Sequence, residues 1–184
     1  MAHFDQTRRT LQIFRGGEAE DFHETGMMES RVAPAAREGI ARMYEAGLAE
    51  GYVLKCLFRS PDPNGFSLSY AWFKPHHALP PHSHSSDCLY YVISGSLFIG
   101  DQVLRSGDGF FLPSGALYAY QAGPEGVEVL EFRDRSSFDI SIGEGSPRGW
   151  ERLVKICRDN QLRWRNAPMP VRDVQWPAKP PSGE

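Results

Sequence analysis

The spacing of hydrophobic residues along the chain changes twice, which divides the sequence into three parts. In residues 32–44 hydrophobic side chains recur every three or four positions, as on one face of an α-helix, and Pro34 suits a first helical turn. From residue 52 to residue 133 hydrophobic and polar residues alternate, which is the spacing of half-buried β-strands. Helical spacing returns in residues 147–157, directly after a serine typical of a helix cap. The pattern predicts a mainly β protein with a helix on each side.

The alternating part consists of short runs separated by Gly, Pro or Asp, and the SPDPNG segment at residues 60–65 is dense in turn-forming residues. Short, regularly interrupted strands are typical of a sandwich or barrel rather than of βαβ units. We therefore predict a single antiparallel β-barrel of the jelly-roll type. Its predicted strands are residues 52–59, 66–74, 89–93, 96–99, 102–104, 109–112, 117–121 and 127–133.

These boundaries predict three regions. Residues 1–50 are expected to form an N-terminal arm and helix, in which the polar residues 1–30 are an irregular lead-in. Residues 51–134 are expected to form the barrel, and residues 135–184 a helix packed outside it and a proline-rich tail. The prolines predict that this tail is extended or disordered. They are Pro168, Pro170, Pro177, Pro180 and Pro181.

Composition and charge limit the classes of function. Hydrophobic residues make up 41% and charged residues 23% of the chain, as expected for a globular protein with a core. The net charge of −3, without a basic stripe, argues against a nucleic-acid partner. No run of about 18 apolar residues is present, which argues against a membrane span, and the first residues lack the apolar run of a signal peptide. The three cysteines have no CxxC spacing, so we expect free thiols in a reducing cytoplasm.

Four of the six histidines fall within nine residues, and two of them form an HSH sequence. On an extended strand, His82 and His84 project from the same face because they are two residues apart. Two converging imidazoles are the beginning of a Zn, Fe, Ni, Mn or Cu site, although a catalytic site usually supplies three ligands. The alternative is a histidine-rich loop beside Pro80 and Pro81 whose imidazoles are merely solvated.

Residues 76–95 resemble the first sequence signature of the cupin superfamily, the RmlC-like β-barrel proteins. That signature has a His-x-His pair, a Glu, and then a Gly after six further residues. Gly95 matches the Gly, whereas Cys88 stands at the Glu position.

Residues 107–121 resemble the second cupin signature. Gly107, Pro113 and Gly115 match its Gly, Pro and Gly, but Tyr118 stands where the family has a metal-binding His. The resemblance implies a six- to eight-stranded barrel that usually pairs as a dimer. It also implies a divalent metal used in dioxygenase, isomerase, lyase or decarboxylase chemistry. Other members of the family lack the metal and bind ligands or act as epimerases.

The resemblance implies that His82 and His84 are metal ligands. The other two ligand positions of the family carry the non-standard residues Cys88 and Tyr118. A Cys88 thiolate would be a soft ligand for Zn or Fe. A Tyr118 phenolate would suit Fe(III), provided that the metal drives its deprotonation. His76 or His77 would be another source of a third imidazole. The alternative is that Cys88 is a small buried hydrophobic residue and Tyr118 part of a pocket wall.

Aromatic side chains are expected around these positions. On the strand of residues 66–74, either Tyr70 and Trp72 or Ser69 and Phe73 face inward. Glu131 is either an inward-facing acid or a solvated surface charge. An aromatic wall suits an apolar or aromatic ligand with a few polar anchors. The residues expected to line the substrate pocket are Tyr90, Tyr120, Trp72 and Phe111.

The leading hypothesis is a metal-dependent cupin-type enzyme acting on a small organic molecule, aromatic or carbonyl-containing, with dioxygenation as the expected reaction. It would use one divalent transition metal (Fe, Zn, Ni or Mn), with Tyr118 and Cys88 as third ligands or acid–base groups. The alternative is a metal-free barrel that binds a small molecule or has a regulatory role. We also expect a homodimer, because the helical stripes at residues 32–44 and 150–157 and the edge strand at residues 52–59 would otherwise lack a cover.

Overall fold

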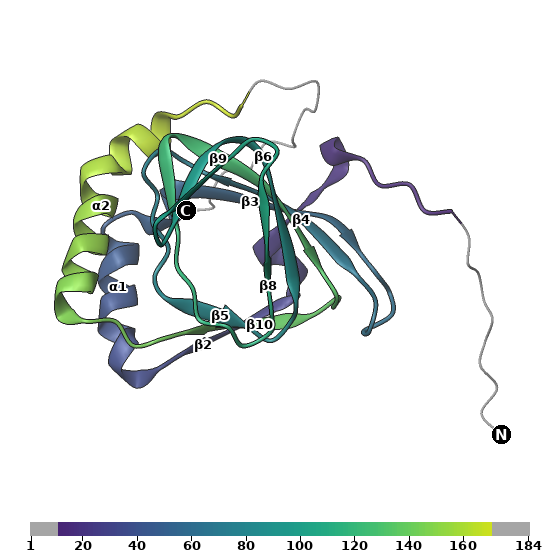
Figure 1. Cartoon of the computed structure of the whole chain (residues 1–184), viewed down its shortest axis with the longest axis horizontal. Coiled ribbons are helices and arrows are strands. Elements are labelled where there is room, and N and C mark those ends of the chain that lie inside the picture. Colours follow the sequence, from purple (N-terminus) through teal and green to yellow (C-terminus); the bar gives the residue numbers. More distant parts are fainter. Residues whose placement is uncertain (1–10, 171–184) are drawn as a thin grey trace, which may run out of the picture.

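All but one of the strands predicted in residues 52–133 lie in one large antiparallel sheet in the computed structural model, which describes residues 11–170 (Figure 1). The strand order is β1-β3-β4-β9-β6-β7, and β8 pairs with β6. Two predicted strands, residues 89–93 and 96–99, are one long strand that bulges in its middle. The strands of this sheet are β1 (Glu20–Asp21), β3 (Tyr52–Arg59), β4 (Ser67–Phe73), β6 (Cys88–Ile99), β7 (Gln102–Arg105), β8 (Gly109–Leu112) and β9 (Gln121–Arg133).

A second, three-stranded sheet faces the first and has the order β2-β10-β5. Its strands are β2 (Met28–Val32), β5 (His82–His84) and β10 (Phe138–Ile142), and β2 runs parallel to β10. Strands β2 and β10 lie outside the predicted barrel region of residues 51–134. Part of the expected irregular lead-in is therefore a sheet strand. Both strands do alternate in sequence, as MESRV and FDISI, but each is only five residues long.

The predicted closed barrel is corrected to two facing sheets that strand pairing does not join. Between the sheets, isolated bridges link Ala78 to Gln121 and His82 to Tyr118. Of the strand that the alternation predicted at residues 117–121, Gln121 is the first residue of β9, and residues 117–120 make only the bridge of Tyr118 to His82. A turn precedes this segment, in which the Ala116 N–H donates to the Pro113 carbonyl. Because the proline and this turn interrupt strand pairing, the segment crosses between the sheets as a loop.

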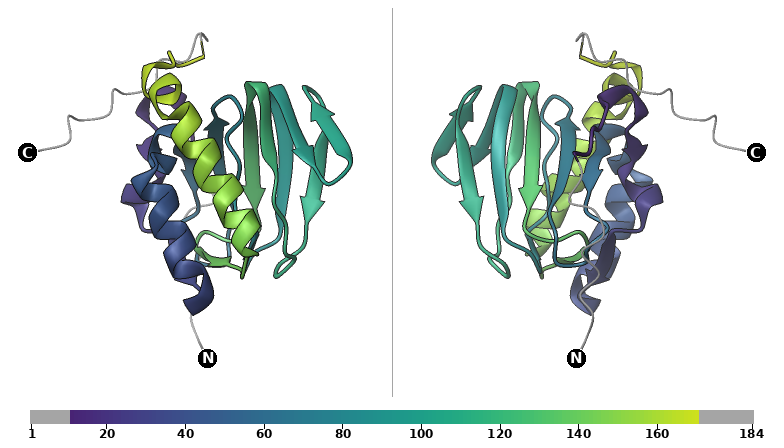
Figure 2. Two further views of the ribbon diagram at one scale, coloured as in Figure 1. Left: turned by 90° about the vertical axis from the view of Figure 1, so that its left-hand side faces the viewer. Right: turned by 90° about the vertical axis from the view of Figure 1, so that its right-hand side faces the viewer.

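Two helices lie side by side on one side of the sheets (Figure 2). Helix α1 (Arg37–Glu45) begins later than predicted, because β2 and a 3₁₀ turn (Pro34–Ala36) occupy the preceding residues. Helix α2 (Pro147–Asn166) is capped by Ser146, whose side chain accepts from the Gly149 N–H at 3.0 Å, and it extends nine residues past Cys157. No helix in residues 11–170 is long and apolar enough to cross a membrane. The predicted tail beyond residue 170 and the first ten residues of the predicted arm lie outside the described residues.

Candidate functional site

The register of the large sheet places polar residues in adjoining rows on its inner face. Ser69 of β4 pairs with Glu131 of β9, which pairs with Tyr90 of β6. In the next inward-facing row, Arg133 pairs with Cys88. Elsewhere the same face is apolar, so these residues form one polar patch on an otherwise hydrophobic surface.

Between this face and the second sheet lies a cavity of about 250 Å³. One part of its wall consists of three residues of the polar patch, Ser69, Glu131 and Arg133, together with the two histidines of β5 and nearby tyrosines, and the rest is largely apolar and aromatic. This composition is typical of a small-molecule pocket. The polar part contains Ser69, His82, His84, Tyr118, Tyr120, Glu131 and Arg133, and the apolar part includes Leu54, Phe73, Leu79, Ile140 and Ile142.

The two histidines of β5 face the cavity as the alternation predicted, with ring centres 5.1 Å apart and ring planes at 85°. His82 Nδ1 lies 2.8 Å from the Pro80 carbonyl oxygen, and His84 Nδ1 lies 3.1 Å from that of Asp139. Because a carbonyl oxygen only accepts, each Nδ1 carries the proton, and each Nε2 has a free lone pair. Neither Nε2 has a hydrogen-bond partner among the described residues.

Burial keeps both imidazoles neutral. It lowers the pKa of His82 to about 4 and that of His84 to about 2, and the nearby positive charge of Arg133 lowers both further. At neutral pH these side chains are therefore lone-pair donors to a metal or hydrogen-bond acceptors. They are not sources of positive charge.

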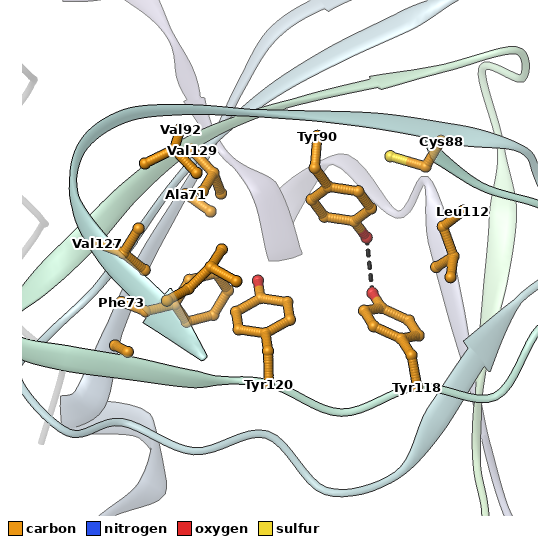
Figure 3. Packing of buried hydrophobic residues seen from close by; sticks show 12 residues of the cluster. Ala71, Phe73, Cys88, Tyr90, Val92, Leu112, Tyr118, Tyr120, Val127 and Val129 are labelled. Carbon is orange, nitrogen blue, oxygen red and sulfur yellow. Dashed lines mark hydrogen bonds between the residues drawn. The ribbon is translucent and has the colours of Figure 1, made fainter. Parts of the chain in front are cut away.

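A chain of hydrogen bonds lies beside the histidines. The hydroxyls of Tyr90 and Tyr118 are 2.6 Å apart (Figure 3), and Arg133 donates to the Tyr90 hydroxyl at 3.1 Å and to Glu131 Oε2 at 2.8 Å. Burial, followed by the charge of Glu131, raises the pKa of Tyr118 well above its usual range, so the phenol is protonated at neutral pH. The Tyr118 ring lies 4.3 Å from that of His82, which places this hydroxyl chain next to the imidazole pair.

Cys88 lies close to Tyr90 but does not line the cavity. Burial raises the pKa of its thiol to about 12, so it is protonated at neutral pH. Tyr120 lines the cavity as expected, and Tyr90 reaches it through its hydroxyl contact with Tyr118. His76 has a left-handed backbone (φ 64°) and is not part of the cavity wall.

Two expected pocket residues are placed elsewhere. Phe111 is 56% exposed on the outer face of the large sheet, and Trp72 faces the C-terminal part of α2. On β4 it is Ser69 and Phe73 that face the cavity. The inward-facing Glu131 was one of two alternatives, and Arg133 was not identified as a site residue, although it shares the parity of Glu131 along β9. The signal available in the sequence was an arginine two residues from an acid in an alternating segment.

The residues fit part of a metal site. Two imidazoles that share a metal at about 2.1 Å would have ring centres roughly 5 Å apart, which agrees with the spacing of His82 and His84. Their Nδ1 contacts to backbone carbonyls are those that commonly orient metal-binding histidines. Within residues 11–170, however, no group of three His, Cys, Asp or Glu side chains is arranged to hold an ion. A third donor would have to be Tyr118 or the substrate.

No protein-family model and no curated protein sequence matches the chain. Among solved structures, the polyketide cyclase RemF from Streptomyces resistomycificus is similar at 16% identity, with a TM-score of 0.52 over 83% of this chain and 99% of RemF. An RmlC-like cupin from Shewanella frigidimarina shares 21% identity over 46% of this chain and 76% of its own, with a TM-score of 0.39. A protein with a cupin-like fold from Ralstonia eutropha shares 20% identity over 73% and 85%, with a TM-score of 0.41.

At these identities the comparisons concern the fold, and the match to RemF extends over most of the chain. The two facing sheets agree with this match. Both signature segments lie at the cavity and its adjoining turns, as the resemblance to cupins implies. The chain has the fold of the cupin superfamily.

Proposed function

We propose that this protein is a metal-dependent enzyme acting on a small, mainly apolar organic molecule held between the two sheets. One observation carries the proposal. Two neutral imidazoles, His82 and His84, present unpartnered Nε2 lone pairs to the same buried cavity.

Unpartnered acceptors at such a site call for a ligand. Both Nε2 atoms face the cavity and can only accept, so together they favour a Lewis acid or a hydrogen-bond donor there. A divalent transition metal (Fe, Zn, Ni or Mn) would be held by His82 and His84, with Tyr118 as the candidate third donor. When bound, it would supply Lewis acidity or redox chemistry to a substrate oxygen.

The remaining polar residues would orient the substrate and hold protons. Tyr118 lies beside His82, and its hydroxyl is hydrogen-bonded to that of Tyr90. Once Tyr118 has given its proton to the substrate, Tyr90 can donate its own proton to the Tyr118 oxygen, which leaves the Tyr90 oxygen beside the Arg133 guanidinium. Arg133 fixes the Tyr90 hydroxyl, and its charge is balanced by Glu131. The pair adds no net charge, which suits a neutral substrate. Cys88 lies behind Tyr90, where it would support the tyrosine rather than contact the substrate. Dioxygenation is the reaction class we propose to test first, by oxygen uptake.

A metal-free binding protein is the second candidate. It is favoured by the protonated states of the Cys88 thiol and the Tyr118 phenol, which leave only two ready metal donors among the described residues. In that case the two imidazoles would accept hydrogen bonds from the ligand itself.

Elemental analysis of protein purified without a histidine tag tests the proposal. We expect close to one transition-metal ion per chain, and loss of that ion in His82→Ala and His84→Ala with the fold retained, because the strands hold the scaffold. His76→Asn is the matched control, since His76 lies off the cavity wall and Asn tolerates its left-handed backbone. Protein that takes up no metal after soaking in Fe, Zn, Ni and Mn salts would establish the metal-free candidate instead.

A further inference from the structure

Glu131 is the only carboxylate in the cavity wall among the residues that the structure describes. Strand β9 places it between Ser69 of β4 and Tyr90 of β6. One carboxylate oxygen, Oε2, accepts from Arg133 at 2.8 Å. The other oxygen, Oε1, has no hydrogen-bond partner within residues 11–170 and is not one of their fully buried polar atoms. Glu131 therefore presents the lone pairs of an anion to whatever occupies the cavity.

A proton donor lies close to this acceptor. Three consecutive hydrogen bonds, of 2.8, 3.1 and 2.6 Å, lead from Glu131 Oε2 through Arg133 and the Tyr90 hydroxyl to the hydroxyl of Tyr118. Because the Tyr90 oxygen accepts from Arg133, the Tyr90 O–H can donate to Tyr118, which leaves the Tyr118 O–H for a further acceptor. An anion that can take a proton and a phenol that can give one thus lie within the span of one small molecule.

Arg133 can keep the charge balanced between these two groups. Its Nη2 atom donates both to Glu131 Oε2 and to the Tyr90 hydroxyl, and its side chain is only 2% exposed. A guanidinium buried to this extent needs a negative partner. When Glu131 takes up a proton and the two tyrosines give one up, the negative charge moves from the carboxylate to the Tyr90 oxygen. The charge stays on the same Arg133 nitrogen, so the guanidinium remains paired before and after the transfer.

We propose that Glu131 is a catalytic base and that the cavity interconverts the keto and enol forms of an uncharged, mainly apolar carbonyl compound. Glu131 Oε1 removes a proton from the carbon next to the carbonyl group, and the electron pair of that C–H bond forms the C=C bond. The carbonyl oxygen takes the proton of Tyr118, and Tyr90 passes its own proton to the Tyr118 oxygen. Return of the protons by the same route restores the ketone, so the balance needs no oxidant. The inference rests on the proposed function as a small-molecule enzyme, but it requires neither a metal nor dioxygen.

Exchange of hydrogen for deuterium measures this activity. Phenylacetone is the probe, because it is uncharged and has a benzylic CH₂ next to its carbonyl group. In D₂O at neutral pD, with the full chain as purified, proton NMR should show the benzylic signal falling faster than in buffer alone. A single base on one side of the cavity reaches one of the two benzylic hydrogens. The signal should therefore level off near half of its starting intensity.

A substitution of the carboxylate identifies the base. Glu131→Gln keeps an oxygen for Arg133 but has no carboxylate to take up the proton. We expect exchange to be at least about 100-fold slower in this variant, which is the lower end of the usual contribution of a general base. Glu125→Gln is the matched control. Glu125 lies on the same strand, is exposed, bonds Ser96 and is not part of the cavity wall, so this variant should keep the wild-type rate.

Three results would overturn the inference. They are exchange at the buffer rate with the wild type, loss of both benzylic hydrogens at equal rates, and an unchanged rate in folded Glu131→Gln. The first two are measured on the wild type alone, so the test does not depend on the folding of a variant. Metal content is determined on the same preparation. Exchange without metal contradicts only the proposed metal dependence, whereas metal without exchange contradicts only the role of Glu131.

Discussion

At the scale of single residues, burial determines the chemistry of the three cavity histidines. Desolvation lowers the pKa of His77, His82 and His84 to about 3, 4 and 2, against 6.5 in an exposed chain. Each is therefore neutral when folded, and each would take up a proton more readily in the unfolded chain. The same burial that keeps these imidazoles neutral also makes the fold sensitive to acid.

This shift predicts how stability depends on pH. Between pH 6.5 and about 3 the unfolded chain binds a proton at His77 that the folded chain does not, so the free energy of unfolding decreases as the pH falls. His77→Phe removes the group that binds this proton. The slope of the free energy of unfolding against pH should then be smaller by at most about 1.4 kcal/mol per pH unit. Urea unfolding at about pH 7.5 and about pH 5.5 measures it. Equal slopes for the two proteins would contradict the buried, neutral state of His77.

At the scale of elements, two glycines of the signature segments are required for different structural reasons. Gly95 has a φ of 74° in the bulged part of β6, and a Cβ there would overlap the carbonyl oxygen of Gly126 on β9. Gly107 also has a positive φ, 94°, but it lies in the turn between β7 and β8 with open space around its Cα. Gly95 is thus required by close packing of strands, and Gly107 by the turn alone.

Matched alanine substitutions separate these two requirements. Gly107→Ala should cost about 1–2 kcal/mol of the free energy of unfolding, the cost of a left-handed backbone for a residue with a Cβ. Gly95→Ala adds the overlap with Gly126 and should cost about 2–4 kcal/mol. Urea unfolding at neutral pH provides both values. A Gly95→Ala variant as stable as Gly107→Ala would show that the two strands separate easily at the bulge.

At the scale of the whole molecule, the helical stripes that suggested a homodimer are covered within the chain. Met43 of α1 and Leu153 of α2 belong to one buried cluster between the helices and the sheets. The outer face of the large sheet remains exposed instead. Its apolar side chains adjoin one another through strand pairing and ring stacking. They include Phe66, Leu89, Tyr91, Phe111 and Phe132.

The homodimer therefore stays a prediction, and this face is now where we expect it to form, because contiguous exposed apolar surface commonly marks an interface. Light scattering over a dilution series should give twice the chain mass at tens of micromolar. Phe111→Lys should have a mass closer to that of the monomer than the wild type has. Because Phe111 is mostly exposed, the substitution should change the free energy of unfolding of the single chain by less than about 0.5 kcal/mol. A wild-type monomer throughout the series would rule the dimer out.

The sequence by itself determined the features that depend on local spacing. Alternation located the long strands, and the two-residue spacing of His82 and His84 placed both imidazoles on one face. Ser146 indicated the start of α2. Gly107, Pro113 and Gly115 of the second cupin signature lie at turns, as the interruptions between the predicted strands indicated, whereas Gly95 lies within β6. Such signals are carried by neighbours in the chain, and they survive in the folded protein because the backbone geometry that produces them is local.

Only the tertiary structure decided which face of each strand meets the cavity and which distant segments complete it. On β4 both faces are buried, so alternation could not choose Ser69 and Phe73 over Tyr70 and Trp72. Strands β2 and β10 are short and gain their stability by pairing with each other across more than a hundred residues. Arg133, His77 and Cys88 acquire their roles from what surrounds them. Burial and contact between distant segments are properties of the assembled fold, which is why local spacing does not report them.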